Sequence, residues 1–309
     1  MKELEALILQ DVQTDIPLLT RVAEHILRSG GKRLRPLLVL LGARSFGTLD
    51  LPILQAAQVV EYLHTATLLH DDVVDGADMR RSQQAARTIW GNEASVLVGD
   101  YLLALAFRML TGLRNPEVLQ LMSHTTRLMA RGELLQLTRS YRQHDLQEYL
   151  DIIHYKTASL FGAAARMGAL LNGAGTAQAD ALFNYGVALG MAFQMVDDAL
   201  DYSEELNIGK PIGTDLQERK ITLPLSHLME HASPAERKEL EQILELPEIG
   251  QLEIRKVAAW MRQHGSIEHT LESARNYVLQ AQAELSVLPD EGTRTLLHEI
   301  ADYVVRRTF

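Results

Sequence analysis

The sequence predicts an all-α fold, and three features of the chain favour this class. Ala, Leu, Glu, Gln and Arg dominate almost every segment, and strong helix formers summed over long windows are informative. Alternating stretches of β-branched residues are nearly absent. Breaks at Gly, Pro and Asn divide the chain into helix-sized pieces. We therefore expect about ten to thirteen helices.

The breaks also predict where individual helices begin and end. In chain order they fall at residues 30–31, 47–50, 76–91, 112–116, 172–175, 206–219, 232–234, 247, 265 and 289. Start signals accompany three of them, at Asp50 before Pro52, Asn92 before Glu93, and Ser233 before Pro234. The segments 76–91 and 206–219 are long, polar and charged, and such loops are often functional.

Composition bounds the function further. The chain has 309 residues, enough to bury a substantial core, and no linker-like shift in composition or fixed repeat, so we expect one domain over residues 1–309. Forty acidic residues against 30 basic ones give a net charge of −10, which argues against binding of nucleic acid. The absence of Cys excludes disulfides and thiolate chemistry. We expect a cytoplasmic protein without a transmembrane segment, because the apolar runs are short and the N-terminus is acidic.

Two clusters of aspartates are the strongest local signal. Asp71, Asp72 and Asp75 follow the apolar run Thr65–Leu69, and the same spacing recurs in Asp197, Asp198 and Asp201 after residues 190–196. On a helix, residues four apart share a face, so the first and last aspartate of each cluster lie one turn apart. The middle aspartate lies about 100° round the helix.

Paired carboxylates near a core repel one another unless cations are present. Hard oxygen ligands of this kind suit Mg²⁺, which keeps several waters and is usually completed by the phosphates of a substrate. Two such helices facing each other predict a site for a diphosphate bridged by Mg²⁺. A solvated acidic face is the alternative, and the second copy of the spacing disfavours it.

A diphosphate also needs direct cationic donors, and four places supply them. The turn Gly30–Pro36 carries Lys32, Arg33 and Arg35 just before a helix, whose N-terminus favours anions. The other candidates are Arg80 and Arg81 after the first cluster, Lys156 beside Thr157, and Lys210 and Lys220 after the second cluster. Arg binds phosphate with two parallel donors, whereas Lys acts as a mobile point charge.

Taken together, these motifs resemble those of the trans-isoprenyl diphosphate synthase family, specifically its long-chain polyprenyl (octaprenyl-type) members. The resemblance runs from the turn at 30–36 to Thr222–Pro224, and it includes residues 61–70, Gly99-Asp100, Lys156-Thr157 and Phe193-Gln194. It implies an isoprenoid synthase helical bundle around a deep central cavity, usually in a homodimer.

The resemblance also implies roles for single residues. About three Mg²⁺ ions would be held, two by Asp71 and Asp75 with Asp72 nearby, and a third by Asp197 with help from Asp198 and Asp201. Isopentenyl diphosphate would bind Lys32, Arg35, His64 and Arg81. The allylic diphosphate would contact Arg80, Lys156, Thr157, Gln194, Lys210 and Lys220. Within these sets the catalytic group would be Asp71, Asp72, Asp75, Arg80, Lys156, Asp197, Lys210 and Lys220.

Two departures from the family pattern lie in the long loops. After Arg81 the family often continues Gly-x-Pro-Thr, where this chain has Ser82-Gln83-Gln84-Ala85. Before Lys220 a Gly is common, where this chain has Arg219. Neither change removes a predicted ligand, although Arg219 could share or compete for the role of Lys220.

The predicted reaction joins an allylic diphosphate, such as farnesyl diphosphate, to successive isopentenyl diphosphates. Ionisation gives an allylic cation, the double bond of isopentenyl diphosphate attacks it, and a proton is lost. No protein nucleophile is needed, but water must be excluded. Ala66 and Thr67 are small where short-chain relatives carry a bulky aromatic, so we expect a tunnel for a long product to pass this level. Met122, Leu128 and Met129 are equal candidates for its floor. Product release would involve transient contact with a membrane.

Four alternatives stay open. A class I terpene cyclase has an aspartate-rich motif, but its second metal motif differs and it lacks the basic turn. A non-catalytic regulatory subunit usually loses acids or the Arg pair, which this chain keeps. The others are a short-chain farnesyl or geranylgeranyl diphosphate synthase and a large subunit that needs a small regulatory partner.

Overall fold

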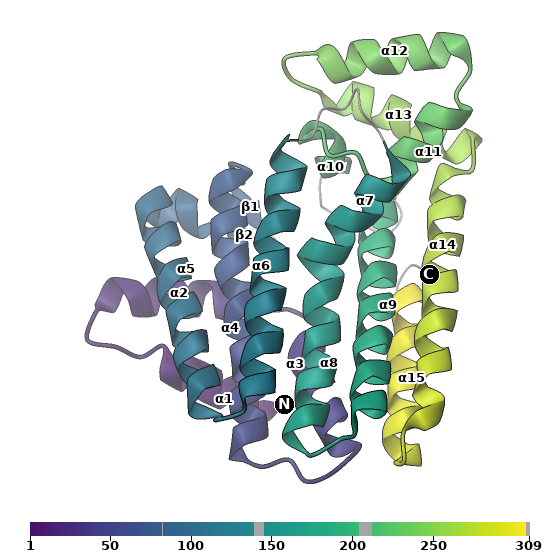
Figure 1. Cartoon of the computed structure of the whole chain (residues 1–309). Coiled ribbons are helices and arrows are strands. Elements are labelled where there is room, and N and C mark those ends of the chain that lie inside the picture. Colours follow the sequence, from purple (N-terminus) through teal and green to yellow (C-terminus); the bar gives the residue numbers. More distant parts are fainter. Residues whose placement is uncertain (82, 139–144, 204–211, 307–309) are drawn as a thin grey trace. The chain divides into compact units, whose positions relative to one another are not determined.

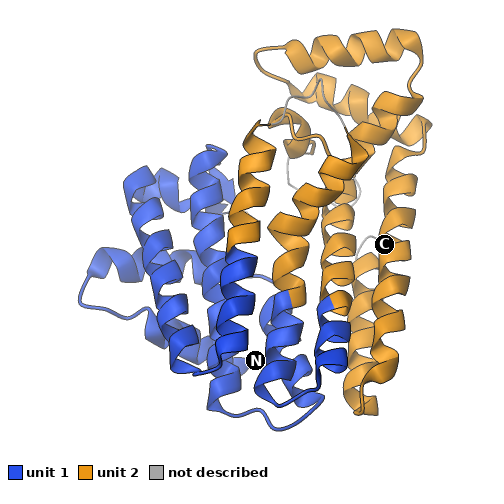
Figure 2. Cartoon of the chain, viewed as in Figure 1, with its two compact units in different colours: residues 1–126, 163–183 blue, residues 127–162, 184–309 orange. Residues whose placement is uncertain are grey.

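The computed structural model confirms the all-α fold. It describes residues 1–81, 83–138, 145–203 and 212–306, and all statements below concern these residues. Helices α1 to α15 make up most of them. The strands β1 (Met79–Arg80) and β2 (Gln83–Gln84) form a small antiparallel hairpin in the predicted loop 76–91, with Arg80 opposite Gln83. The chain divides into two compact units (Figure 2), so the expected single domain stays a prediction.

Unit 1 consists of residues 1–126 and 163–183. Its elements are α1 (Lys2–Asp11), α2 (Pro17–Arg28), α3 (Leu34–Arg44), α4 (Leu51–Val74), the hairpin, α5 (Ala86–Gly112), the first part of α6 (Pro116–Thr138), the last part of α8 (Ser159–Leu171) and the start of α9 (Thr176–Leu200).

Helix α4 is central to unit 1, where it packs against α3 and along α5 (Figure 1). Its Tyr62 is fully buried and donates a hydrogen bond to the carbonyl of Ile8 (3.1 Å), which holds α1 against α4. Helices α3 and α8 approach closely at two glycines. A Cβ on Gly42 would overlap the carbonyl of Ala165, and one on Gly168 would overlap that of Val39. Helix α4 therefore lies in a tightly packed unit.

Among the described residues, one helix, α5, has the length and the apolar composition that a membrane span requires. In its most apolar stretch 44% of the residues are buried, and the helix packs along α4 as a core helix does. Its backbone breaks at Gly91, whose φ of 87° and ψ of 165° are not helical. A continuous span is therefore shorter than the 27 residues assigned to α5.

Unit 2 consists of residues 127–162 and 184–309, described as far as residue 306. It holds the rest of α6, α8 and α9, together with α7 (Leu146–Ile153), the π-helix η1 (His154–Ala158), α10 (Thr214–Gln217), α11 (Leu223–His231), α12 (Pro234–Glu245), α13 (Gln251–Gln263), α14 (Ser266–Ala283), the 3₁₀-helix η2 (Glu284–Val287) and α15 (Glu291–Arg306).

An apolar core in unit 2 joins α11, α12 and α13 to the segment that carries Lys220. Ile212, Leu216, Leu225 and Met261 are among its buried members. Helices α14 and α15 lie side by side (Figure 1), and Tyr185 on α9 donates to the carbonyl of Leu297 on α15 (2.7 Å). Tyr202, directly after Asp201, is a fully buried member of the same core, so the end of α9, where the second aspartate cluster lies, is fixed by packing inside its own unit.

Two of the three predicted helix starts are confirmed. Asp50 caps α4 by accepting a hydrogen bond from the amide of Ile53 (3.3 Å). Ser233 and Glu236 form a reciprocal capping box at α12. The third prediction, a helix start at Asn92, was wrong by one residue, because the helical backbone is interrupted at Gly91. The side chain of Asn92 does not cap the helix but accepts a hydrogen bond from Arg87.

Candidate active site

The first aspartate cluster lies at the C-terminal end of α4. Helix α4 ends at Val74, and the amide of Asp75 still bonds to the carbonyl of Asp71 (2.8 Å), so these two residues lie one turn apart. Asp71 and Asp75 are half-buried, whereas Asp72 is fully buried. The C-terminal end of a helix carries partial negative charge, which adds to that of the carboxylates and favours a cation.

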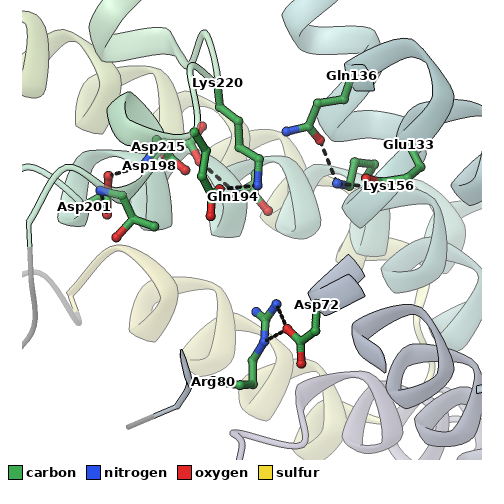
Figure 3. A network of polar contacts seen from close by, with 12 residues as sticks. Asp72, Arg80, Glu133, Gln136, Lys156, Gln194, Asp198, Asp201, Asp215 and Lys220 are labelled. Atoms are coloured by element: carbon green, nitrogen blue, oxygen red, sulfur yellow. Dashed lines mark hydrogen bonds and ion pairs between the residues drawn. The ribbon is translucent and has the colours of Figure 1, made fainter. Parts of the chain in front are cut away.

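Asp72 is paired with Arg80 on the hairpin. Arg80 donates from Nε to Asp72 Oδ1 (2.7 Å), and its Nη2 lies 2.5 Å from the same oxygen (Figure 3). Burial raises the pKa of Asp72 above its usual range, although the charge of Arg80 works in the opposite direction. Asp72 Oδ2 is buried without a hydrogen-bond partner. Asp72 thus positions the hairpin beside the cluster.

A cluster of basic residues lies along the same helix. Arg35 on α3 contacts His64 on α4, with 3.1 Å between Arg35 Nη1 and His64 Nε2. Burial lowers the pKa of His64 well below 6.5, and the positive charges of Arg35, Arg81, Arg80 and Arg33 lower it further. His64 is therefore neutral at pH 7, and because Arg is only a donor, His64 Nε2 is the acceptor.

Arg33 and Arg81 are held by the neighbouring chain. Arg33 forms an ion pair with the buried Glu61 and donates to the carbonyl of Leu27 (2.5 Å). Arg81 lies over Gly31, where a Cβ would come within 2.8 Å of its guanidinium. Burial lowers the pKa of Arg81, and the charge of Glu61 opposes that shift. Gly31, with φ of 149°, is needed for this close approach.

The second aspartate cluster repeats the burial pattern of the first. Helix α9 ends at Leu200, and the amide of Asp201 bonds to the carbonyl of Asp197 (3.1 Å). Asp197 and Asp201 are half-buried, and the middle residue, Asp198, is buried. Burial raises the pKa of Asp198 to about 7, while the hydrogen bonds from Gln194 and Tyr149 oppose the shift.

Asp201 holds the start of α10, which sequence reasoning did not foresee. Its two carboxylate oxygens accept from the amides of Thr214 (3.2 Å) and Asp215 (2.9 Å). Burial raises the pKa of Asp201, and burial followed by the charges of Asp201 and Asp198 raises that of Asp215 well above its usual range. Asp215 is thus a fourth acid beside the cluster, and the Thr-Asp pair at a helix start was the available signal.

Lys156 and Thr157 lie on the π-helix η1, a form of helix often found at functional sites. Lys156 donates to Gln136 (2.7 Å) and forms an ion pair with Glu133, both on α6 (Figure 3). A Cβ on Gly132 would lie 2.9 Å from the Lys156 backbone nitrogen, so α6 and η1 are in close contact. Glu133 and Gln136 were not singled out in the sequence, since nothing in its spacing relates them to Lys156.

Lys220 and Arg219 are adjacent in sequence but contact different groups. Lys220 forms an ion pair with Glu218 (2.6 Å). Arg219 has φ of 55°, and its guanidinium donates to the carbonyls of Leu244, Leu246 and Pro247. The left-handed backbone explains why Gly is common here in the family. Arg219 thus supports the loop after α12, and its sharing or competing for the role of Lys220 stays a prediction. Lys210 lies outside the described residues.

The two predicted chain-length residues differ in their surroundings. Ala66 is buried, with 2% of its surface exposed, whereas Thr67 is half-buried and its hydroxyl donates to the carbonyl of His64 (2.8 Å). Thr67 lies four residues before Asp71 and shares its face of α4. The roles of both residues stay predictions.

Among the described residues no three acidic or histidine side chains converge tightly enough to enclose a metal ion. The carboxylates nevertheless fit Mg²⁺, because this ion keeps several waters and is completed by the phosphates of a substrate. In each cluster by itself the donors are hard oxygens at a helix C-terminus, which suit such a partly enclosed ion. The magnesium roles of the six aspartates stay predictions.

The comparisons with known proteins agree with this architecture. The sequence model of the family described as Polyprenyl synthetase matches residues 16–261. The chain is 40% identical to octaprenyl diphosphate synthase of Escherichia coli (strain K12), over 99% of this chain and 95% of that one. It is 34% identical to heptaprenyl diphosphate synthase component 2 of Bacillus subtilis (strain 168), over 97% and 86% of the two chains.

A solved structure is equally similar. The polyprenyl synthase from Caulobacter crescentus CB15, complexed with calcium and isoprenyl diphosphate, superposes with a TM-score of 0.94 and 40% identity, over 99% of this chain and 94% of that one. The all-α architecture is therefore that of an isoprenoid synthase. The chain belongs to the polyprenyl synthetase family, and it is a prenyltransferase.

Proposed function

We propose that this protein is a long-chain all-trans polyprenyl diphosphate synthase, which condenses an allylic diphosphate with successive isopentenyl diphosphates. The observation that carries the proposal is the repeated cluster. At the ends of both α4 and α9, two half-buried aspartates lie one turn apart beside a buried third. The 40% identity to an octaprenyl diphosphate synthase supports a long product over a short one.

In this proposal the allylic diphosphate is bound through Mg²⁺ by Asp71 and Asp75 in one cluster and Asp197 in the other. When bound, the magnesium supplies Lewis-acid stabilisation of the leaving diphosphate. The Caulobacter enzyme was solved with calcium and isoprenyl diphosphate, which supports a divalent cation here. Lys156 and Lys220 add positive charge, and each forms an ion pair with an acidic neighbour, Glu133 and Glu218 respectively.

Isopentenyl diphosphate is assigned to Lys32, Arg35, His64 and Arg81. Arg35 and Arg81 are half-buried, so their charges are screened less than those of exposed residues. His64 stays neutral and accepts from Arg35, so its role is to orient that guanidinium rather than to add charge. No side chain in this set needs to act as a nucleophile, since the double bond of isopentenyl diphosphate attacks the allylic cation.

The assembly we propose is a homodimer in the cytoplasm, with transient membrane contact when the product leaves. Val96, Leu97 and Tyr101 on α5 are exposed although large and apolar, and Leu97 has 66% of its surface exposed. Residues 97 and 101 share one face of the helix. An apolar face of this kind is typical of a surface that is covered by a partner.

The test is product analysis of the purified chain with farnesyl diphosphate, labelled isopentenyl diphosphate and Mg²⁺. We expect a labelled polyprenyl diphosphate longer than geranylgeranyl diphosphate. Asp71→Ala and Asp197→Ala should each nearly abolish turnover while the variants still fold, because both residues are half-buried and not part of the core. Asp15→Ala, in an exposed turn, is the control that should retain full activity. Active Asp71→Ala and Asp197→Ala variants would refute the proposal.

A second candidate is a large subunit that needs a small partner. It is favoured by the similarity to component 2 of a two-component heptaprenyl diphosphate synthase. The same assay separates the candidates. If the pure chain is inactive while its metal-dependent binding of farnesyl diphosphate is intact, the two-component enzyme is supported. Turnover by the chain alone supports the first proposal.

A further inference from the structure

A chain of three hydrogen bonds in unit 2 links α7, α9 and the π-helix. The hydroxyl of Tyr149 donates to Asp198 Oδ2 (2.7 Å). Asp198 Oδ1 accepts from Gln194 Nε2 (2.8 Å), one turn earlier on α9. Gln194 Oε1 in turn accepts from the hydroxyl of Thr157 (2.9 Å) on η1. Tyr149 was not singled out in the sequence, and it lies 49 residues from its partner.

With Asp198 ionised, these groups allow only one arrangement of donors, and it is the one that the structure shows. An ionised carboxylate accepts and cannot donate, so Gln194 turns its amide nitrogen toward Asp198 (2.8 Å). Its oxygen then faces Thr157, which must donate. The network therefore fixes the direction in which the second amide N–H of Gln194 points. Both oxygens of Asp198 are used by protein donors, although its place in the aspartate cluster had suggested a metal ligand.

The start of the network is deeply buried. Tyr149 and Asp198 each have 3% of their surface exposed, so water does not replace a lost hydrogen bond there. Removing the phenol hydroxyl leaves a buried carboxylate oxygen without its donor, which is costly for a charged group. Asp198 would then move or take up other donors, and Gln194 would lose its fixed orientation.

We propose that Tyr149 is a positioning residue, which acts through Asp198 to aim the amide of Gln194 at the allylic diphosphate; this inference rests on the proposed function. Thr157 supports Gln194 from the other side, and its hydroxyl hydrogen is committed to Gln194. Asp198 is then a part of this support and not a ligand of the metal. The residues assigned to isopentenyl diphosphate are not members of the network.

The experiment compares Tyr149→Phe with Tyr185→Phe. Tyr185 is a matched control, because it is also buried in unit 2 and donates at the same distance of 2.7 Å, but to a backbone carbonyl on α15. Kinetics are measured with farnesyl diphosphate and isopentenyl diphosphate varied in turn. Binding of an unreactive thiolo analogue of farnesyl diphosphate is measured by calorimetry, and stability by thermal unfolding in EDTA.

For Tyr149→Phe we expect the KM for farnesyl diphosphate and the Kd of the analogue to rise about tenfold, the size of one hydrogen bond to a charged group. The KM for isopentenyl diphosphate should change by no more than about twofold. This is a small change, since a tenfold one corresponds to 1.4 kcal/mol. Tyr185→Phe should lower the unfolding temperature without changing either KM. When Asp198→Asn is already present, adding Tyr149→Phe should cause no further rise in the KM for farnesyl diphosphate or in the Kd of the analogue.

The inference is overturned if Tyr149→Phe behaves like Tyr185→Phe, or if its effect adds to that of Asp198→Asn. If Tyr149→Phe does not fold, Asp198→Asn alone decides, because a folded variant with an unchanged KM for farnesyl diphosphate excludes the network from binding. A wild-type chain without prenyltransferase activity would instead overturn the proposed function. An active wild type with an unaffected Tyr149→Phe variant overturns only this inference.

Discussion

Arg80 and Asp72 form an ion pair in which the carboxylate is fully buried and the guanidinium is partly exposed, with a bond of 2.7 Å from Arg80 Nε to Asp72 Oδ1. The pair joins the hairpin to the end of α4. Its counterpart in unit 2 is the bond between Tyr149 and Asp198. The middle aspartate of each cluster is thus bound by its own unit, and its neighbours on either side keep partial exposure.

Breaking this pair should destabilise the protein in a pH-dependent way. We expect Arg80→Met to lower the free energy of unfolding by about 1.5–3 kcal/mol at pH 8, because it removes a hydrogen bond to a buried charged group. The folded state raises the pKa of Asp72, so protonation favours folding and the loss should shrink as the pH falls to 5. Urea unfolding in EDTA measures both values. An equal loss at the two pH values would contradict the role given to Asp72.

His64 should make stability fall in acid. Its pKa in the folded state lies well below 6.5, so the unfolded chain takes up a proton there that the folded chain does not. This contribution is present above pH 6.5 and is lost as the pH falls below it, so the loss should be measurable between pH 7.5 and 5.5. His64→Gln, which can still accept from Arg35, should lack this part of the pH dependence. The difference between the two unfolding curves is the measurement.

Bulky residues one turn below Asp71 should shorten the product. We expect Ala66→Phe and Thr67→Phe to stop elongation earlier while turnover of the first condensation is preserved. Ala66 is buried, so its replacement should also cost about 1–3 kcal/mol of stability, whereas Thr67 has more room. Chromatography of the products decides. If both variants give the wild-type distribution of lengths, the tunnel does not pass this level.

Arg219 should matter for folding and not for catalysis. Its φ of 55° costs an L-residue about 1 kcal/mol, and its guanidinium bonds to carbonyls after α12. Arg219→Gly should therefore be less destabilising than Arg219→Ala, since both lose the hydrogen bonds but only Gly relieves the backbone. Both variants should keep the wild-type KM for the allylic diphosphate. A raised KM in both would instead assign Arg219 to the substrate.

Much of the candidate site could be predicted from the chain alone, because its chemistry is local. The spacing of Asp71 and Asp75, or of Asp197 and Asp201, places two carboxylates on one face of a helix whatever the rest of the fold does. The helix starts at Asp50 and Ser233 are local for the same reason, since each cap involves residues only three apart. Composition and periodicity were likewise enough for the all-α class.

The partners of those residues could not be predicted, because they come from distant parts of the chain. Tyr149 meets Asp198 across 49 residues, and Glu133 meets Lys156 through the close contact at Gly132. No spacing rule relates such pairs, since tertiary packing brings them together. Burial then raises the pKa of Asp72 and lowers that of His64, because desolvation depends on what covers a side chain. The sequence determined which residues can bind a diphosphate, and only the tertiary structure decided which of them are already bound to one another.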